Sequence, residues 1–167
     1  MQPSKFTPVI ISSVVIVIIS LFPFLNFINL LCCAGVILGG AAGTAYYHNQ
    51  LNKTGSIIQY KDGVAIGVLS GIISALIVVI GTTLMTMIVR QNPVPEIYKI
   101  IDSQGFQIPP DADKFLQQIS SEYDKNGFSI TLTLISLVAD LISYPIFSAI
   151  GGMLTVAIYS KKRNAVQ

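Results

Sequence analysis

The chain has 167 residues, of which 52% are hydrophobic and only 11% are charged, and its mean hydropathy is +0.69. A soluble domain of this size covers an apolar core with charged side chains, and ten basic plus eight acidic residues are too few for that. The composition therefore excludes a water-soluble globule and indicates a protein that resides in a lipid bilayer. The net charge of +2 comes mostly from the C-terminal tail, so we expect no nucleic-acid partner.

Four apolar stretches are long enough to be membrane-spanning helices, because roughly 20 residues cross a hydrocarbon layer of about 30 Å. They occupy residues 9–25, 30–47, 64–89 and 130–159. Pro8 suits the start of the first stretch, and Arg90 followed by Pro93 ends the third. The fourth stretch is longer than the membrane is thick, so we expect a kink at Pro145 or a segment outside the bilayer.

The segment between the first two stretches is predicted to be a tight helical hairpin, because Pro23, Asn26 and Asn29 interrupt it. A secretory signal peptide is the alternative for the N-terminus, but no small-residue cleavage site comes before the second stretch. The adjacent Cys32 and Cys33 follow bulky leucines, unlike a lipidated cysteine. We interpret them as buried packing residues, and we expect no metal site and no cofactor.

The basic residues favour one orientation in the membrane. With four spans, both termini and the middle loop share a side that carries Lys5, Lys53, Lys61, Lys161, Lys162 and Arg163. The opposite side carries Arg90, Lys99, Lys114 and Lys125, spread through a long loop rich in acidic residues. The positive-inside rule therefore predicts that both termini are cytoplasmic. The sequon at residues 52–54 would then be silent.

The loop of residues 91–127, between the third and fourth stretches, is the only part that resembles soluble protein. Pro109 and Pro110 divide it into two predicted helices, and Asp111 can cap the second. The apolar residues of the second helix share one face: Phe115, Leu116, Ile119 and Tyr123. This amphipathic pair is expected to lie on the membrane surface or to cap the outer end of the bundle. The alternative is a docking surface in which Phe115, Ile119 and Tyr123 contact a partner.

Glycine recurs at intervals of four residues in two neighbouring stretches. The spacing defines one stripe of Gly35, Gly39 and Gly43 and another of Gly63, Gly67 and Gly71, with Gly152 in the fourth stretch. Small residues let helix backbones approach closely in lipid, where the hydrophobic effect does not drive association. We predict that these seven glycines pack helices together and that the second and third helices touch along the two stripes.

A faint repeat relates the two halves of the chain. The pattern from Gly39 to Tyr47 recurs from Gly151 to Tyr159, which is the sign of a duplicated two-helix hairpin.

Three motifs follow one another along the chain. The first is Pro-x-x-Asn followed by Cys-Cys and Gly-Gly, the second is residues 61–71, and the third is residues 145–163, which end in basic side chains. This order resembles a group of uncharacterised bacterial small membrane proteins that carry a domain-of-unknown-function label. The resemblance implies the bacterial inner membrane and supplies no activity.

Asp140 is the one ionisable residue placed within an apolar stretch. Three interpretations are open: a hydrated or helix-capping carboxylate at the outer interface, a buried structural pair, or a group that carries a proton or cation. His48 has no second histidine with which to share a metal, and the serines of the stretches have no neighbouring base. No phosphate-binding glycine loop is present. We therefore do not expect an enzyme.

The sequence thus predicts an all-α, polytopic membrane protein that forms one membrane domain over residues 1–167, with four transmembrane helices and an amphipathic exterior loop. The expected function is non-catalytic. Helix contacts would assemble the chain with itself or make it an accessory subunit of a larger membrane complex, in the lipid bilayer of the inner membrane. The alternative is a small transporter or channel in which Asp140 couples to a proton or cation.

Overall fold

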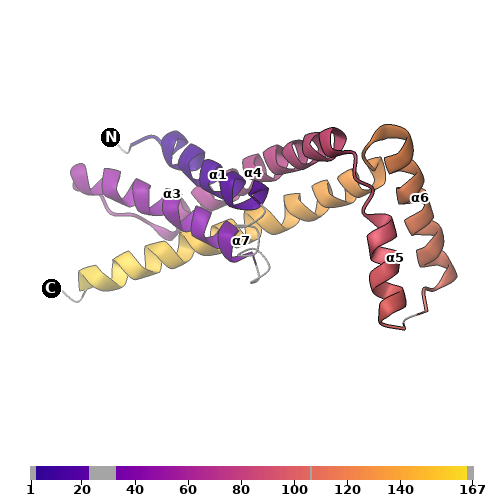
Figure 1. Ribbon diagram of the computed structural model, residues 1–167. Coiled ribbons are helices and arrows are strands. Elements are labelled where there is room, and N and C mark those ends of the chain that lie inside the picture. The colour runs from indigo at the N-terminus through magenta and orange to yellow at the C-terminus, as the bar shows by residue number, and fades with distance from the viewer. Residues whose placement is uncertain (1–2, 23–32, 106, 165–167) are drawn as a thin grey trace. The chain divides into compact units, whose positions relative to one another are not determined.

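The computed structural model describes residues 3–22, 33–105 and 107–164, and in these ranges the chain forms helices and no strands (Figure 1). The helices are α1 (Phe6–Leu21), α3 (Ala34–Lys53), α4 (Tyr60–Val89), α5 (Val94–Ser103), α6 (Pro110–Asn126) and α7 (Ile130–Asn164). The all-α prediction is confirmed. The predicted hairpin at Pro23, Asn26 and Asn29 lies outside the described residues, as does Cys32.

Helices α4 and α7 are the two that are long and apolar enough to cross a membrane among the described residues. Helix α1 is apolar but has only 16 residues. Helix α7 continues through Pro145 for 35 residues, which at 1.5 Å per residue is about 52 Å. It is therefore longer than a bilayer's hydrocarbon layer, as its sequence led us to expect.

Contacts along the chain divide it into two compact units. The bundle unit comprises Met1–Val78 and Ala139–Gln167, and the hairpin unit comprises Val79–Val138. Helices α4 and α7 each contribute to both units, since both helices run through the boundaries between them.

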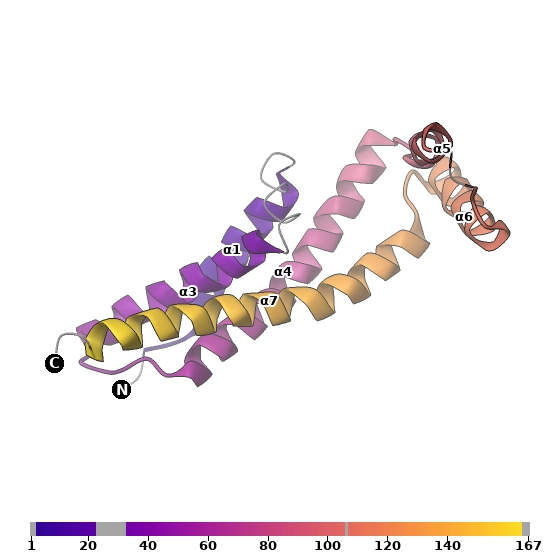
Figure 2. The same cartoon turned by 90° about the horizontal axis from the view of Figure 1, so that it is seen from below.

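The bundle unit contains α1, α3, the first part of α4 and the last part of α7. Helix α1 begins and α7 ends at the same end of this unit (Figures 1 and 2). Near that end, Tyr47 and Ile66 are fully buried in one apolar cluster. A second cluster surrounds Ile16 and Ala75, and the half-buried Cys33 packs against it, as a packing residue would. The bundle unit thus has its own core.

The hairpin unit contains the remaining parts of α4 and α7 together with α5 and α6, which pack against each other. Pro109 precedes α6, and Gly127 ends it in the left-handed conformation (φ 77°), which glycine adopts without strain. Val94 and Ile119 are buried at 2% exposure each. The pair of helices predicted for residues 91–127 is confirmed, and the exterior position of this segment stays a prediction.

Candidate functional site

The glycine stripe of α3 faces α1. A Cβ on Gly39 would overlap the side chain of Ile16, and a Cβ on Gly43 would lie 2.5 Å from the carbonyl oxygen of Pro8. Gly35, the third member of the stripe, is buried. A side chain on Gly39 or Gly43 would therefore not fit unless α1 moved.

The glycine stripe of α4 faces α7. A Cβ on Gly67 would lie 2.5 Å from the Cα atom of Ala149, and a Cβ on Gly71 would lie 2.5 Å from the Cα atom of Pro145. The closest approaches of the stripes are therefore to α1 and α7, although Gly43 also lies near the Ile66 side chain of α4, so the predicted contact of the two helices along both stripes stays a prediction. Four-residue spacing indicates which face of a helix is small but not which helix covers that face.

The third glycine of the α4 stripe meets a glycine of α7. A Cβ on Gly63 would lie 2.7 Å from the carbonyl oxygen of Gly152, so the backbones of α4 and α7 are in direct contact at these two glycines. Sequence reasoning missed Gly40 and Gly151 as packing residues, although each stands in a Gly-Gly pair. A Cβ on Gly40 would overlap Ser148, and a Cβ on Gly151 would overlap the Ile37 carbonyl, so one further glycine of each pair brings α3 and α7 together.

Buried hydroxyl groups join three helices where the glycines let them approach. The Oγ atom of Ser12 on α1 lies 2.9 Å from that of Ser70 on α4, and Ser70 lies 3.1 Å from the Oγ atom of Ser148 on α7. All three side chains are fully buried. A buried hydroxyl costs free energy unless it is hydrogen-bonded, so these serines specify how the helices pair.

An ion pair lies at the end of the bundle unit where α1 and α4 begin. The Nζ atom of Lys5 is 2.7 Å from Oδ1 of Asp62, whose side chain is 2% exposed. The other carboxylate oxygen accepts a hydrogen bond from the backbone N–H of Gln59 at 2.9 Å, as in the capping of a helix N-terminus. The sequence showed Lys5 only as a flanking positive charge and did not single out Asp62, because the two residues are 57 positions apart in the chain.

Asp140 lies on α7 in the bundle unit and is half-buried. No described side chain forms a hydrogen bond or ion pair with it. One turn further along, the hydroxyl of Tyr144 lies 3.2 Å from Oγ of Ser20 on α1. The geometry thus offers Asp140 no partner among the described residues, and its interfacial and ion-coupling interpretations stay predictions.

Glu122 ties the end of α6 to the start of α7 in the hairpin unit. Its carboxylate accepts hydrogen bonds from the Ser129 hydroxyl at 2.6 Å and from the backbone N–H and hydroxyl of Thr131 at 2.9 and 2.6 Å. These bonds, with the Ser129 hydroxyl contributing most, lower the pKa of Glu122 from 4.5 to about 2. Sequence reasoning missed this cluster, because the partners Ser129 and Thr131 lie in the turn that follows α6 and in the first turn of α7.

Two further side chains hold α5 against α6. The Nδ2 atom of Asn92 donates to Ser120 Oγ at 2.9 Å and to Asp124 Oδ1 at 3.0 Å. The hydroxyl of Tyr98 donates to Asp113 at 2.6 Å, and this hydrogen bond raises the pKa of Tyr98. The hairpin unit is therefore a defined structure whose helices are joined by polar contacts.

The docking face predicted on α6 is corrected by the burial of its central residue. Ile119 is only 2% exposed, while Phe115 is 40% exposed and Tyr123 is half-buried. The large apolar side chains that are exposed on α5 and α6 are Phe115 on α6 and Ile97 and Ile100 on α5, the last two 38% and 57% exposed.

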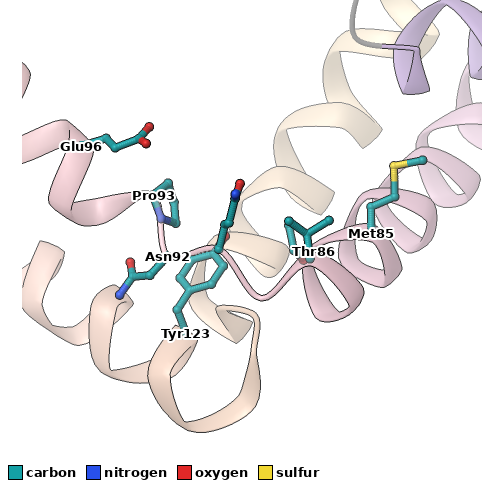
Figure 3. Close-up of a pocket in the computed structure, with 8 residues that line it drawn as sticks. Met85, Thr86, Asn92, Pro93, Glu96 and Tyr123 are labelled. Carbon is teal, nitrogen blue, oxygen red and sulfur yellow. The ribbon is translucent and has the colours of Figure 1, made fainter.

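An open groove of about 380 Å³ lies where α4 ends, within the hairpin unit (Figure 3). Glu96 and Met85 stand on opposite sides of the groove, with Asn92 and the ring of Tyr123 between them. Arg90, which follows α4 in a left-handed conformation (φ 51°), lines an adjoining hollow of about 330 Å³ that shares Asn92 and Tyr123. Sequence reasoning missed the groove, because its walls come from α4, α5 and α6.

Within the described ranges, no three His, Cys, Asp or Glu side chains come together as metal ligands. Comparisons of the chain with protein-family models, curated proteins and solved structures find no match. The resemblance to small bacterial membrane proteins of unknown function therefore stays a prediction.

Proposed function

We propose that this chain is an integral membrane protein that acts through contacts and not through catalysis, with α1, α3, α4 and α7 in the bilayer of the bacterial inner membrane. The observation that carries the proposal is the exposure of α7. Only 6% of its most apolar 18-residue window is buried by the rest of the chain, against 50% for α4. The core helix of a soluble protein would be mostly buried.

The exposed residues of α7 form a continuous apolar face. Leu134, Val138, Ile142 and Ile146 recur every four residues and are each more than half exposed. Leaving such side chains in water costs roughly 25 cal/mol for each Å² of apolar surface. Lipid tails, or the apolar helices of a partner, would cover this face without that cost.

The glycine stripes do not provide the surface for assembly. Each stripe already contacts a helix of the same chain, so the glycines support the bundle unit itself. Assembly would therefore use the bulky faces of α4 and α7 and the open side chains of α5 and α6. The chain would serve as a subunit, either of its own oligomer or of a larger membrane complex. The common end at which α1 begins and α7 ends supports the part of the proposal that places both termini on one side of the membrane, and the basic residues near them favour the cytoplasmic side.

The test is to purify the protein at native expression level in a mild detergent and to identify by mass spectrometry what accompanies it and in what ratio. We expect a stoichiometric partner or a defined homo-oligomer. A Phe115→Ser variant should weaken a complex that uses the hairpin unit, with Lys99→Ser on an exposed site of α5 as the control. Recovery of a pure monomer would contradict the proposal.

A second function rests on Asp140, the unpaired carboxylate of α7. An ionisable group within an apolar helix is costly and is often a site of ion transfer. If the protein is a small transporter or channel, Asp140→Asn should abolish a pH-dependent flux in proteoliposomes. Asp102→Asn, an exposed carboxylate on α5, is the control. An unchanged flux in the Asp140→Asn variant would remove this alternative.

A further inference from the structure

The groove at the end of α4 is lined by both apolar and polar side chains. Met85, Thr86 and Val89 of α4 line it together with Gln91 of the linker and Glu96 of α5, and Met85 and Glu96 stand on opposite sides (Figure 3). The ring of Tyr123 lies between the two sides (Figure 3). Its volume of about 380 Å³ is within the range of small-molecule sites.

The position of the groove in the chain favours an amphiphile as its occupant. The apolar segment of α4 ends at Val89, and the next residues are Arg90, Gln91 and Asn92. If α4 spans the bilayer as proposed above, the groove lies at the membrane interface, where tyrosine side chains are common. A lipid there has its tail beside Met85 and Val89 and its headgroup beside Glu96.

The charges around the groove select the headgroup. Glu96 is the only charged residue that lines the groove, and it is exposed without an ion-pair partner among the described residues. A carboxylate and the Gln91 amide oxygen can accept hydrogen bonds from a primary ammonium group, which has three N–H donors. A choline headgroup has none. The ring of Tyr123 can also attract a cation.

The adjoining hollow carries the opposite charge. Arg90 and Lys125 line it together with Asp124, which already accepts a hydrogen bond from Asn92. The guanidinium of Arg90 has no ion-pair partner among the described residues and suits a phosphate group.

We propose that the groove binds one phospholipid with a primary-amine headgroup, phosphatidylethanolamine, with its ammonium group on Glu96 and its acyl chain along Met85 and Val89. This inference rests on the proposed function, because it requires α4 to cross the bilayer. The lipid would be held at the junction from which α5 and α6 extend, and it would be part of the surface that the hairpin unit presents.

The absence of tryptophan from the chain makes a direct test possible. Met85→Trp places a single fluorophore at the rim of the groove, and Val89→Trp is a second reporter on the same wall. Ile142→Trp, on the exposed face of α7, is the control reporter. Each variant is reconstituted in phosphatidylcholine vesicles with increasing amounts of either phosphatidylethanolamine or phosphatidylcholine that carries bromine on its acyl chains, which quenches nearby tryptophan.

We expect brominated phosphatidylethanolamine to associate with the groove reporters about three to five times more strongly than brominated phosphatidylcholine, the factor given by one exposed ion pair. The control reporter should be quenched equally by both lipids. Adding Glu96→Gln should abolish the preference at the groove, and Asp102→Asn should leave it unchanged.

Equal quenching of the groove reporters by the two lipids, with normal quenching of Ile142→Trp, would overturn the lipid site and leave the proposed membrane function intact. A stronger response to brominated phosphatidylglycerol than to brominated phosphatidylethanolamine would also overturn it, because the groove would then select an anion. An unquenched Ile142→Trp would contradict the membrane function and the lipid site together.

Discussion

The bundle unit and the hairpin unit are held together by different interactions. In the bundle unit, glycines bring helix backbones into contact, buried serines join the helices, and one carboxylate is buried in an ion pair. In the hairpin unit, α5 and α6 each bury one apolar side chain, Val94 and Ile119, and polar groups near the surface join α5 to α6 and α6 to the turn before α7. The bundle unit thus satisfies its own small-residue faces, while the hairpin unit leaves a groove and apolar side chains open. Substitutions in the first unit should affect folding, and substitutions in the second should affect binding.

The largest effect is expected for Gly67→Leu in the bundle unit. Even a Cβ would lie 2.5 Å from the Cα atom of Ala149, and a backbone cannot move aside as a flexible side chain can. We expect a loss of about 3 kcal/mol or more in stability, measured by thermal unfolding in detergent. The control is Leu69→Phe on the same helix, where the side chain is 50% exposed. Equal stability of the two variants would show that α4 and α7 are not in backbone contact.

The next largest effect is expected for Lys5→Ala. This change leaves Asp62 buried without its cation, at a cost of about 2 kcal/mol, below the range for a fully buried pair because Lys5 is 34% exposed. The double variant with Asp62→Asn should regain much of the lost stability, since asparagine can still accept the hydrogen bond from Gln59. Additive losses in a double-mutant cycle would refute the ion pair.

A smaller effect, dependent on pH, is expected in the hairpin unit from Glu122. Its pKa is lowered on folding from 4.5 to about 2, so its hydrogen bonds stabilise the native state above pH 4.5. That stabilisation is lost as the pH falls from 4.5 towards 2, when the carboxylate takes up a proton. Glu122→Gln should remove this part of the pH dependence. The measurement is hydrogen exchange of the backbone amides at the start of α7 as a function of pH. Asp124→Asn is the matched control, and an identical pH profile for wild type and Glu122→Gln would contradict the assignment.

The smallest effect on folding is expected for Ile100→Ser on α5. The side chain is 57% exposed, so stability should change by less than about 0.5 kcal/mol. If the hairpin unit contacts a partner through this side, the variant should still fold and yet lose the accompanying subunit on purification. A folded variant that keeps its partner would exclude Ile100 from the contact.

The helices were largely predictable because their signals are local. Apolar runs of about 20 residues, and prolines at positions 93 and 109–110, define where helices can form and end. Helix α1 begins two residues before Pro8, since proline is tolerated in the first turn of a helix. The amphipathic pattern of α6 put Ile119 on the apolar face of that helix, and the structure buries this side chain. The pattern alone could not show which residue of that face would be buried.

The site residues were less predictable because their partners are distant in the chain. Lys5 and Asp62 belong to different helices, and each alone has the appearance of a charge that flanks a span. The groove likewise needs three helices, and none of its residues forms a motif. Seven glycines were recognised as packing residues from their spacing, but two more in Gly-Gly pairs were not.

Composition and periodicity alone were enough to define an all-α chain with long apolar helices, an amphipathic pair of helices and small-residue stripes, because each property depends on residues within one or two helical turns. Tertiary structure decided which helix each stripe contacts, that buried Asp62 forms an ion pair with Lys5, and that a groove opens beside Glu96. These properties depend on residues tens of positions apart, and only the packing of whole helices brings such residues within contact distance.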